Sequence, residues 1–197
     1  MTGKYPISYS RTTKSTGTVR IDTERLALRR FMETDADDLY ENYGSDDNVR
    51  RFISFFPCST REGAREFIDM HIQRYQATRD FYGWAITLDG VVIGSIGLFD
   101  IDHESDSCEI GYSLGSRWWG LGYATEAVSA VLDFAFNTLG AHRIQATYHP
   151  DNIASKRVLE KVNMRYEGVM RDGQKNPDGS FSDQIVCARL STDNLDG

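Results

Sequence analysis

Residues 117–126 read RWWGLGYATE and lie between a short strand pattern and a long amphipathic pattern. Gly120 and Gly122 allow positive φ angles and a close approach of the backbone to a ligand. Because a helix is predicted to begin directly after them, several backbone N–H groups of its first turn point toward one spot. Such a spot binds phosphate. A tight strand-to-helix turn uses the same glycines, so this alternative stays open on the loop alone.

The same spacing argues against two other kinds of phosphate-binding protein. The chain has no GxxxxGK[ST] sequence, and a dinucleotide-binding fingerprint would need its third glycine where this chain has Thr125. Nucleotide hydrolysis and nicotinamide chemistry are therefore disfavoured.

Hydrophobic spacing predicts a helix after this loop and strands before it. Apolar residues recur three and four positions apart from Ala124 to Leu139, and Gly140 closes the pattern. Upstream, alternation predicts strands over 81–88, 91–99 and 107–114, and an Asp-Gly turn joins the first two.

The same periodicities predict the remaining elements and the fold class. They are strands over residues 26–31, 143–149, 166–171 and 181–190 and helices over residues 35–43, 60–78 and 152–162. Thr34 is the predicted N-cap of the first helix. An antiparallel meander followed by helix crossovers predicts an α/β fold, a three-layer α/β sandwich in which helices flank a mixed, mostly antiparallel sheet.

The composition is that of a soluble globular protein. Of 197 residues, 40% are hydrophobic and 26% are charged, and the formal net charge is −7, which argues against a broad nucleic-acid-binding face. No apolar run approaches the ~20 residues that cross a bilayer, and the N-terminus lacks the apolar stretch of a signal peptide. We therefore expect a cytoplasmic protein that binds neither membrane nor nucleic acid directly.

The first twenty residues differ from the rest because they carry basic residues and no acidic one. We expect residues 1–20 to be a basic, poorly ordered leader and residues 21–197 to form a single domain. A basic arm that reaches a partner, such as RNA, is the functional alternative.

Cysteines and histidines do not cluster. Cys58, Cys108 and Cys187 are an odd number without a CxxC pair, and the histidines lack HxxxH spacing. We therefore expect neither a disulfide framework nor a metal site.

Three motifs together resemble one known family. The 117–122 loop followed by residues 124–127 (ATEA) is similar to the acetyl-CoA pyrophosphate loop of the GNAT superfamily of N-acetyltransferases. Residues 108–112 (CEIGY) and 152–155 (NIAS) resemble the RimJ/RimL-like branch, which acetylates ribosomal-protein N-termini. The resemblance covers residues 23–190 and implies the acyl-CoA N-acyltransferase fold and an acetyl-CoA-dependent N-acetyltransferase activity.

The resemblance implies a cofactor site built largely from backbone groups. Arg117 belongs to the loop motif, and the N–H groups that would hold the pyrophosphate are those of Trp119, Gly120, Leu121, Gly122, Tyr123 and Ala124. Tyr112, Ser113 and Leu114 would pair with the pantetheine arm, whose two amides make it behave as a short extra strand. We expect a β-bulge at Gly111 to open the sheet edge that receives it.

By the same resemblance, the start of the 152–162 helix would contact the reacting end of acetyl-CoA. Asn152 would hydrogen-bond the pantetheine or the acetyl group; an ordinary N-cap is the alternative, and both can hold. Ser155 would protonate the leaving CoA thiolate, and a solvent-facing helix serine is its alternative. Many members carry a tyrosine four residues later, where this chain has Leu159, so Ser155 or a water is the remaining candidate acid.

Glu109 is the candidate general base. An amine attacks a thioester only when neutral, so some group must take its proton. Glu109 lies on the strand next to the cofactor loop, although an outward-facing strand glutamate is the alternative. His149 is a second candidate base, for which a structural histidine is the favoured alternative. Cys108 would point to the opposite face of the strand, so direct attack in a ternary complex is favoured over an acyl-enzyme.

The acceptor can be weighed by its pKa. Deprotonating a lysine at pH 7 costs roughly 4.6 kcal/mol, against about 1 kcal/mol for an α-amine. A protein N-terminus is therefore favoured, in agreement with the resemblance. A small amine such as a polyamine or aminoglycoside, and a non-catalytic CoA-binding module, are the alternatives, and a homodimer stays open. An apolar patch lies where the superfamily admits its acceptor and comprises Phe52, Phe55, Phe56 and Pro57. Core packing of an irregular segment is the alternative for this patch.

Overall fold

The computed structural model describes residues 15–53, 57–176 and 178–193. Within these residues the centre is an eight-stranded sheet of order β1-β2-β3-β4-β5-β6-β8-β7. β5 and β6 run parallel, and the other neighbouring pairs run antiparallel. The strands are β1 (Ile21–Asp22), β2 (Ala27–Arg29), β3 (Tyr82–Leu88), β4 (Val91–Asp102), β5 (Ser107–Leu114), β6 (Arg143–Tyr148), β7 (Arg165–Lys175) and β8 (Phe181–Leu190).

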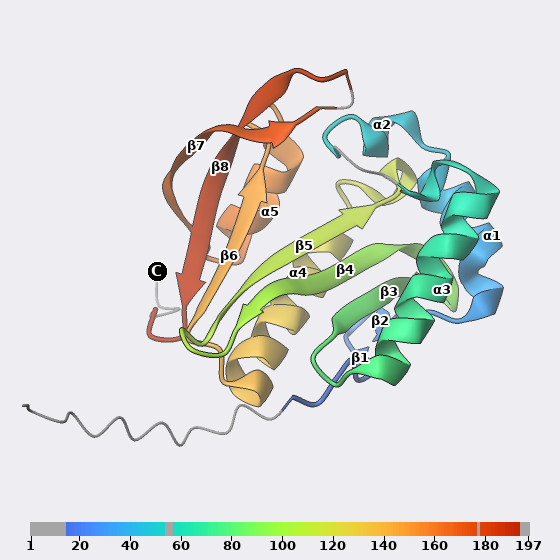
Figure 1. Ribbon diagram of the computed structural model, residues 1–197, viewed down its shortest axis with the longest axis horizontal. Coiled ribbons are helices and arrows are strands. Elements are labelled where there is room, and N and C mark those ends of the chain that lie inside the picture. The colour runs from blue at the N-terminus through green and yellow to red at the C-terminus, as the bar shows by residue number, and fades with distance from the viewer. Residues whose placement is uncertain (1–14, 54–56, 177, 194–197) are drawn as a thin grey trace, which may run out of the picture.

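Helices cover both faces of this sheet (Figure 1). On one face, Ile68 of α3 shares a core with Ala85 and Val92 of β3 and β4. On the other face, Leu132 of α4 and Leu159 of α5 lie in a second core with the inner strands. The three-layer sandwich on a mixed, mostly antiparallel sheet is therefore confirmed. The helices are α1 (Ala36–Leu39), α2 (Asp47–Arg50), α3 (Arg61–Ala77), α4 (Tyr123–Phe134) and α5 (Ile153–Lys161).

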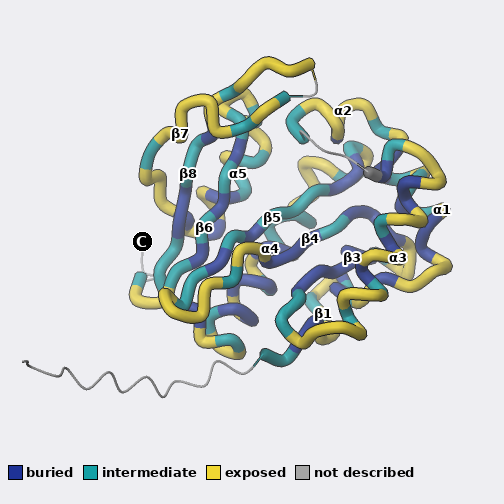
Figure 2. Tube along the Cα trace, viewed as in Figure 1, coloured by how far each residue is buried: buried dark blue, intermediate teal, exposed yellow. Residues whose placement is uncertain are grey.

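The helix predicted over 35–43 is present, but as successive helical turns of different kinds and not as one regular α-helix. This segment starts as a 3-10 turn (η1, Glu33–Asp35), continues as α1 and ends as a π-helical turn (η2, Tyr40–Gly44). Thr34 lies inside the first turn instead of capping a helix. β1 and α2 were missed because they are too short to show a period. β7 continues past the predicted end at residue 171, because its exposed course along the sheet edge (Figure 2) lacks the alternation that marks a half-buried strand.

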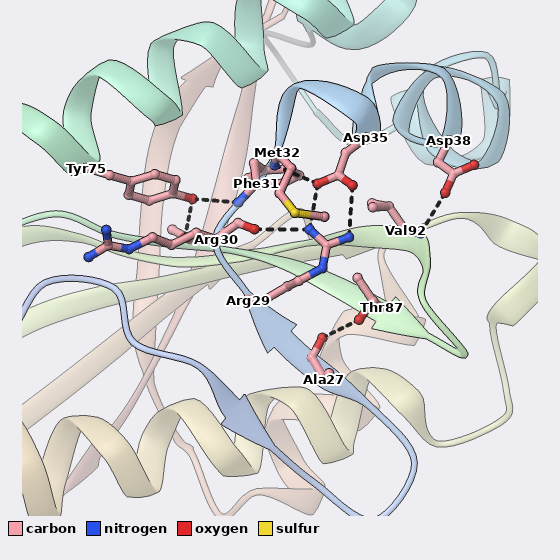
Figure 3. Close-up of polar contacts among 11 residues, drawn as sticks. Ala27, Arg29, Arg30, Phe31, Met32, Asp35, Asp38, Tyr75, Thr87 and Val92 are labelled. Atoms are coloured by element: carbon pink, nitrogen blue, oxygen red, sulfur yellow. Dashed lines mark hydrogen bonds and ion pairs between the residues drawn. The ribbon is translucent and has the colours of Figure 1, made fainter.

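A buried ion pair holds this irregular segment to β2 (Figure 3). Arg29 Nη1 and Nη2 donate to the two carboxylate oxygens of Asp35 at 2.7 and 2.9 Å, and Asp35 is only 4% exposed. The Met32 N–H donates to the same carboxylate at 2.8 Å. The Tyr75 hydroxyl of α3 accepts from the Phe31 N–H at 3.2 Å. Because these bonds satisfy the buried polar groups, the segment keeps a fixed path without a regular helix.

Residues 15–20, the described part of the predicted leader, lie beside β3. The buried Thr18 hydroxyl donates to the Phe81 carbonyl at 2.9 Å and accepts from the Gly83 N–H at 3.1 Å. The Val19 carbonyl accepts from Trp84 Nε1 at 2.6 Å. This part of the chain therefore contacts the domain. The boundary at residue 20 stays a prediction, and residues 1–14 lie outside the described part.

His71 lies on the inner side of α3 in an aromatic cluster. Its Nδ1 lies 2.8 Å from the Phe67 carbonyl oxygen. The ring centroids of Phe31, Phe67 and Phe81 lie 4.9, 4.2 and 5.3 Å from that of His71. Burial in this apolar setting lowers the pKa of His71 from its ordinary 6.5 to about 4.

We expect His71 to make the fold sensitive to acid. The unfolded chain takes up this proton near pH 6.5 and the folded protein only near pH 4, so stability falls as the pH drops between these values. The shift corresponds to about 3 kcal/mol. His71→Asn keeps a donor close to the position of Nδ1 but does not titrate. Its unfolding free energy in urea should therefore fall less steeply over this range, and equal slopes for both proteins would contradict the assignment.

Candidate active site

β5 and β6 separate partway along β5. Parallel pairing joins Ser107, Cys108 and Glu109 to residues 143–145, and among the described residues it ends there. Beyond this point residues 110–114 of β5 pair only with β4. Figure 1 shows the two strands diverging. An unpaired strand edge inside a sheet can receive an extended chain.

The opening does not come from a bulge at Gly111, so that prediction is wrong. Gly111 pairs in regular register with Gly97 of β4. A Cβ on Gly111 would lie 2.7 Å from Cε2 of Phe99, so the glycine makes room for that ring. Ser113, on the same face, hydrogen-bonds the buried Tyr43. The sheet opens because β6 turns away from β5.

Alternation along β5 places Glu109 and its neighbours on opposite faces. Cys108 and Ile110 lie in the core shared with α4, so the Glu109 side chain projects from the other face. Its Oε1 accepts from Thr147 Oγ1 and its Oε2 from Gln145 Nε2, both at 3.0 Å. Glu109 is therefore a half-buried, hydrogen-bonded carboxylate at the point where the two strands part.

The loop after β5 has the geometry that its glycines predicted. Gly120 and Gly122 have φ angles of 75° and 85°. The Glu126 N–H donates to the Gly122 carbonyl at 3.0 Å as α4 begins, so the preceding N–H groups of the first turn have no acceptor within the helix. Nothing lies within 4 Å of a Cβ placed on Gly120. The positive end of α4 is therefore open to an anion.

Glu126 fastens this loop to the β1–β2 turn. Its Oε1 accepts from Thr23 Oγ1 at 2.6 Å, and its Oε2 accepts from Arg25 Nε at 2.7 Å. Arg25 Nη1 donates to the Leu121 carbonyl at 3.0 Å, and the guanidinium lies 4.4 Å from the centroid of the Tyr123 ring. Burial raises the pKa of Glu126, but the hydrogen bonds from Thr23 and Arg25 outweigh it and hold that pKa below its ordinary value.

Sequence reasoning did not find the two partners of Glu126. Thr23 and Arg25 precede it by 103 and 101 positions, and no local pattern links residues so far apart. They bond to the Glu126 carboxylate and the Leu121 carbonyl, and not to the N–H groups of the first helical turn.

The residues before the glycines bond within the loop. The Trp119 N–H donates to the Ser116 carbonyl at 3.1 Å, and its Nε1 donates to the Leu114 carbonyl at 2.8 Å. Trp118 packs against the core, and the exposed Arg117 guanidinium lies 5.4 Å from its ring centroid. Because the Trp119 N–H is engaged, the predicted pyrophosphate donors that remain are those of residues 120–124.

The start of α5 lies beside the core face of β5. Asn152 is its N-cap, since its Oδ1 accepts from the Ser155 N–H at 3.0 Å. Ser155 Oγ lies 3.1 Å from the Tyr112 hydroxyl. Burial raises the pKa of Tyr112 to about 12, so its hydroxyl stays protonated at neutral pH. Leu159 is buried in the core.

The Tyr112 hydroxyl is a candidate functional group that sequence reasoning missed. We predicted only its backbone as a partner of pantetheine. The available signal was the alternation of β5, which places Tyr112 on the face opposite Glu109. Glu109 and Ser155 accordingly lie on opposite faces of the sheet, with the opening between them.

A cavity of about 400 Å³ lies beyond the end of β6 and is lined by residues that follow α2 and by residues of the β7–β8 hairpin. Phe52, from the predicted acceptor patch, lies against His149, with ring centroids 5.2 Å apart. Phe55 and Phe56 lie outside the described residues. The cavity is lined by Arg51, Phe52, His149, Asp151, Gln174, Asn176 and Asp178.

His149 fits the role of base less well than Glu109. Its Nδ1 accepts from the Asp151 N–H at 3.1 Å. A neutral ring in this arrangement carries its proton on Nε2, so neither nitrogen offers a free lone pair. His149 would have to give up this bond before accepting a proton.

The cysteines are poor nucleophiles in this structure. Burial raises the pKa of both Cys58 and Cys108 to about 12 and raises that of Cys187 as well. Each thiol therefore stays protonated at neutral pH. Within the described ranges, no three His, Cys, Asp or Glu side chains gather as a metal site requires. No helix in the described part of the chain has the length and apolar character of a membrane span.

Comparison with known proteins gives the class of this enzyme. Residues 25–165 match the family described as acetyltransferase (GNAT) domain. The chain is 35% identical over 154 residues to the uncharacterized N-acetyltransferase p20 of Bacillus licheniformis, covering 78% of this chain and 86% of p20. It is 26% identical over 183 residues to the [ribosomal protein uS5]-alanine N-acetyltransferase of Escherichia coli, covering 89% and 92%.

Solved structures agree with this class. A GNAT-family acetyltransferase from Bacillus anthracis has a TM-score of 0.76 and 29% identity, covering 89% of this chain and 100% of the other. Mycobacterium smegmatis RimJ in complex with CoA-disulfide has a TM-score of 0.76 and 25% identity, covering 87% and 84%. The fold and the matches define an N-acetyltransferase. The chain belongs to the GNAT family, as its motifs implied.

We expect Gly122→Ala to weaken CoA binding more than it destabilises the fold. A left-handed φ costs an L-residue about 1–2 kcal/mol, and the new Cβ would lie 3.3 Å from Arg25 Nη2. Gly140→Ala is the matched control. Gly140 also has a left-handed φ, 75°, and ends the π-helical turn Ala135–Leu139 that continues α4. Nothing lies within 4 Å of a Cβ added to it.

Calorimetric titration should show about tenfold weaker CoA binding for Gly122→Ala, equivalent to about 1.4 kcal/mol, and unchanged binding for Gly140→Ala. Urea unfolding should show similar stability losses in both variants. Equal CoA affinities of Gly122→Ala and the wild type would mean that Gly122 is needed only for the backbone turn.

Proposed function

We propose that the protein transfers the acetyl group of acetyl-CoA to the α-amino group of a protein N-terminus in the cytoplasm, by direct attack within a ternary complex. The family supports an acetyl donor, and one structural relative was solved with a CoA disulfide. Another relative acts, by its name, on an alanine of ribosomal protein uS5.

The observation that carries this proposal is the opening between β5 and β6. The pantetheine arm, an extended chain with two amides, would pair with the backbone edge of Tyr112, Ser113 and Leu114 that β6 leaves open. The Leu114 carbonyl on this strand already accepts from Trp119 Nε1 at 2.8 Å. Its pyrophosphate would lie against the N–H groups of residues 120–124 at the start of α4. Asn152 would contact the pantetheine beside Ser155. The thioester would then lie in the opening, within reach of both faces of the sheet.

Glu109 would act as the general base from one face. The neutral amine nitrogen bonds to the thioester carbonyl carbon, and its surplus proton passes to the Glu109 carboxylate, directly or through one water. The hydrogen bonds from Gln145 and Thr147 hold the carboxylate toward the opening. Catalysis through positioned groups needs such fixed orientation.

Ser155 and Tyr112 would act from the other face. When the tetrahedral adduct collapses, the C–S bond breaks and the CoA thiolate takes a proton from the Ser155 hydroxyl. Tyr112, 3.1 Å from Ser155 Oγ and protonated at neutral pH, would return a proton to it and would regain its own proton from water after CoA leaves. The buried, protonated cysteines support direct attack over an acyl-enzyme.

The acceptor class is tested by a mass-shift assay. Peptides with a free α-amine, N-terminally blocked peptides containing lysine, polyamines and aminoglycosides are each incubated with acetyl-CoA. Acetylation of the free peptides alone is the expected result. The second candidate is a small cationic amine, favoured by Asp151 and Asp178 at the cavity, and modification of polyamines alone would establish it instead.

We expect Glu109→Gln to lower the acetylation rate by about 10²- to 10⁴-fold at pH 7, because the amide keeps the shape but not the base. An α-amine becomes neutral without help above its pKa of about 8, so part of the loss should be recovered toward pH ~9.5. The control is Glu104→Gln, an equal change of charge on the exposed β4–β5 turn. A loss of tenfold or less at every pH would assign Glu109 a structural role.

We expect Ser155→Ala and Tyr112→Phe each to lower the rate at pH 7 by about 10- to 100-fold. The deficit should narrow above pH ~8.5, where a thiolate leaves without a proton donor. Because the two hydroxyls would form one relay, the double variant should be no slower than Ser155→Ala alone. Fully additive losses in steady-state kinetics would contradict the relay.

A further inference from the structure

Asp46 lies at the start of two helical segments at once. Its Oδ1 accepts from the N–H and the side-chain amide of Asn48 at 3.0 and 3.1 Å, which caps α2. Its Oδ2 accepts from the N–H of Ser116 at 2.8 Å, 70 positions along the chain. Ser116 is the first residue of η4 (Ser116–Trp118). Burial raises the pKa of Asp46, but the hydrogen bonds from Ser116 and Asn48 outweigh it, so the pKa lies below its ordinary value.

These two segments lead to the two halves of the proposed site. η4 continues into Trp119 and Gly120, where the cofactor loop begins. α2 continues into Arg51 and Phe52, which line the cavity beside His149. One carboxylate therefore connects the cofactor loop to the wall of the cavity.

The surroundings of Asp46 leave little room for independent movement. A Cβ on Gly44, two residues before Asp46, would lie 2.0 Å from the carbonyl oxygen of Cys58. A Cβ on Gly115, just before Ser116, would lie 1.9 Å from the carbonyl oxygen of Asn42. Because these backbones are in direct contact, a shift of η4 is passed on to η2 and α2 rather than absorbed by a gap.

We propose that Asp46 is a positioning residue that couples the cofactor loop to the acceptor side of the enzyme. When CoA occupies the loop, η4 is held, and through Asp46 it holds α2 and Phe52 in the arrangement that receives the acceptor. The inference rests on the proposed function, because it takes the loop as the cofactor site and the cavity as the acceptor site. By linkage, a bound acceptor tightens CoA binding by the same factor.

Asp46→Asn separates this connection from simple helix capping. Asparagine is as good an N-cap as aspartate. Its single amide oxygen can cap α2, but its nitrogen cannot accept from the Ser116 N–H. Thr60→Ala is the matched control, since it removes the bond from the Gly63 N–H that caps α3 and Thr60 is not among the cavity-lining residues.

The first measurement needs no acceptor. Amide hydrogen exchange of residues 47–53 is followed with and without saturating CoA. In the wild type and in Thr60→Ala, CoA should slow this exchange by about tenfold. In Asp46→Asn the slowing should be lost, although CoA still binds, with a Kd raised by no more than about tenfold.

The second measurement uses a peptide with an N-terminal alanine. For Asp46→Asn we expect the KM for the peptide to rise about tenfold while kcat stays within about threefold, because the acceptor wall is misplaced and the reacting groups are not. Thr60→Ala should change neither value. A merely structural role for Asp46 would lower stability without this split between KM and kcat.

The outcomes separate a failure of the proposed coupling from a failure of the proposed function. If CoA binds but exchange at 47–53 does not slow, or if Asp46→Asn keeps the slowing, the coupling is wrong and the proposed function stands. If no peptide is acetylated, the acceptor class is wrong, and the exchange measurement still decides the role of Asp46. If the wild type does not bind CoA, the proposed function and the coupling are both overturned.

Discussion

The site depends on a parallel pairing between β5 and β6 that lasts for three residue pairs and ends at Glu109. Had the pairing continued, the free edge of residues 111–114 would bond to β6, and no extended ligand could reach it. Because the β5–β6 pairing ends early, Glu109 and Tyr112 of β5 lie at the border of a gap. Alternation along the strand puts Glu109 on one face of the sheet and Tyr112 on the other. In the proposed mechanism Glu109 would act as the base from one face, and Tyr112 would support Ser155 as the acid from the other.

The gap alone would not hold a cofactor as highly charged as CoA in a protein whose net charge is −7. In the proposed site the attraction would come from the oriented backbone N–H groups at the positive end of α4. Arg25, the basic residue fastened to this loop, has its charge paired with Glu126. Its contribution is geometric, since it holds the Leu121 carbonyl and leaves the first-turn N–H groups to the ligand.

The proposed ternary mechanism requires that the donor and the acceptor meet in one geometry, although they would bind to different parts of the chain. Asp46 connects these parts, because one oxygen of its carboxylate accepts from α2 and the other from the Ser116 N–H. The buried, protonated cysteines agree with this arrangement, because no covalent intermediate then stores the acetyl group between two half-reactions.

Local chemistry explains what the sequence by itself determined: the order of the main elements, the left-handed glycines before α4, and Asn152 and Gly140 at helix ends. Each depends on periodicity or on bonds between residues a few positions apart. Only the tertiary structure decided the opening at Glu109, the Tyr112–Ser155 contact across 43 positions and the Asp46–Ser116 bond across 70. These depend on where one strand leaves another and which face each residue then occupies. That is settled by packing over the whole sheet, as Phe99 shows by filling the space at Gly111 where we had expected a bulge.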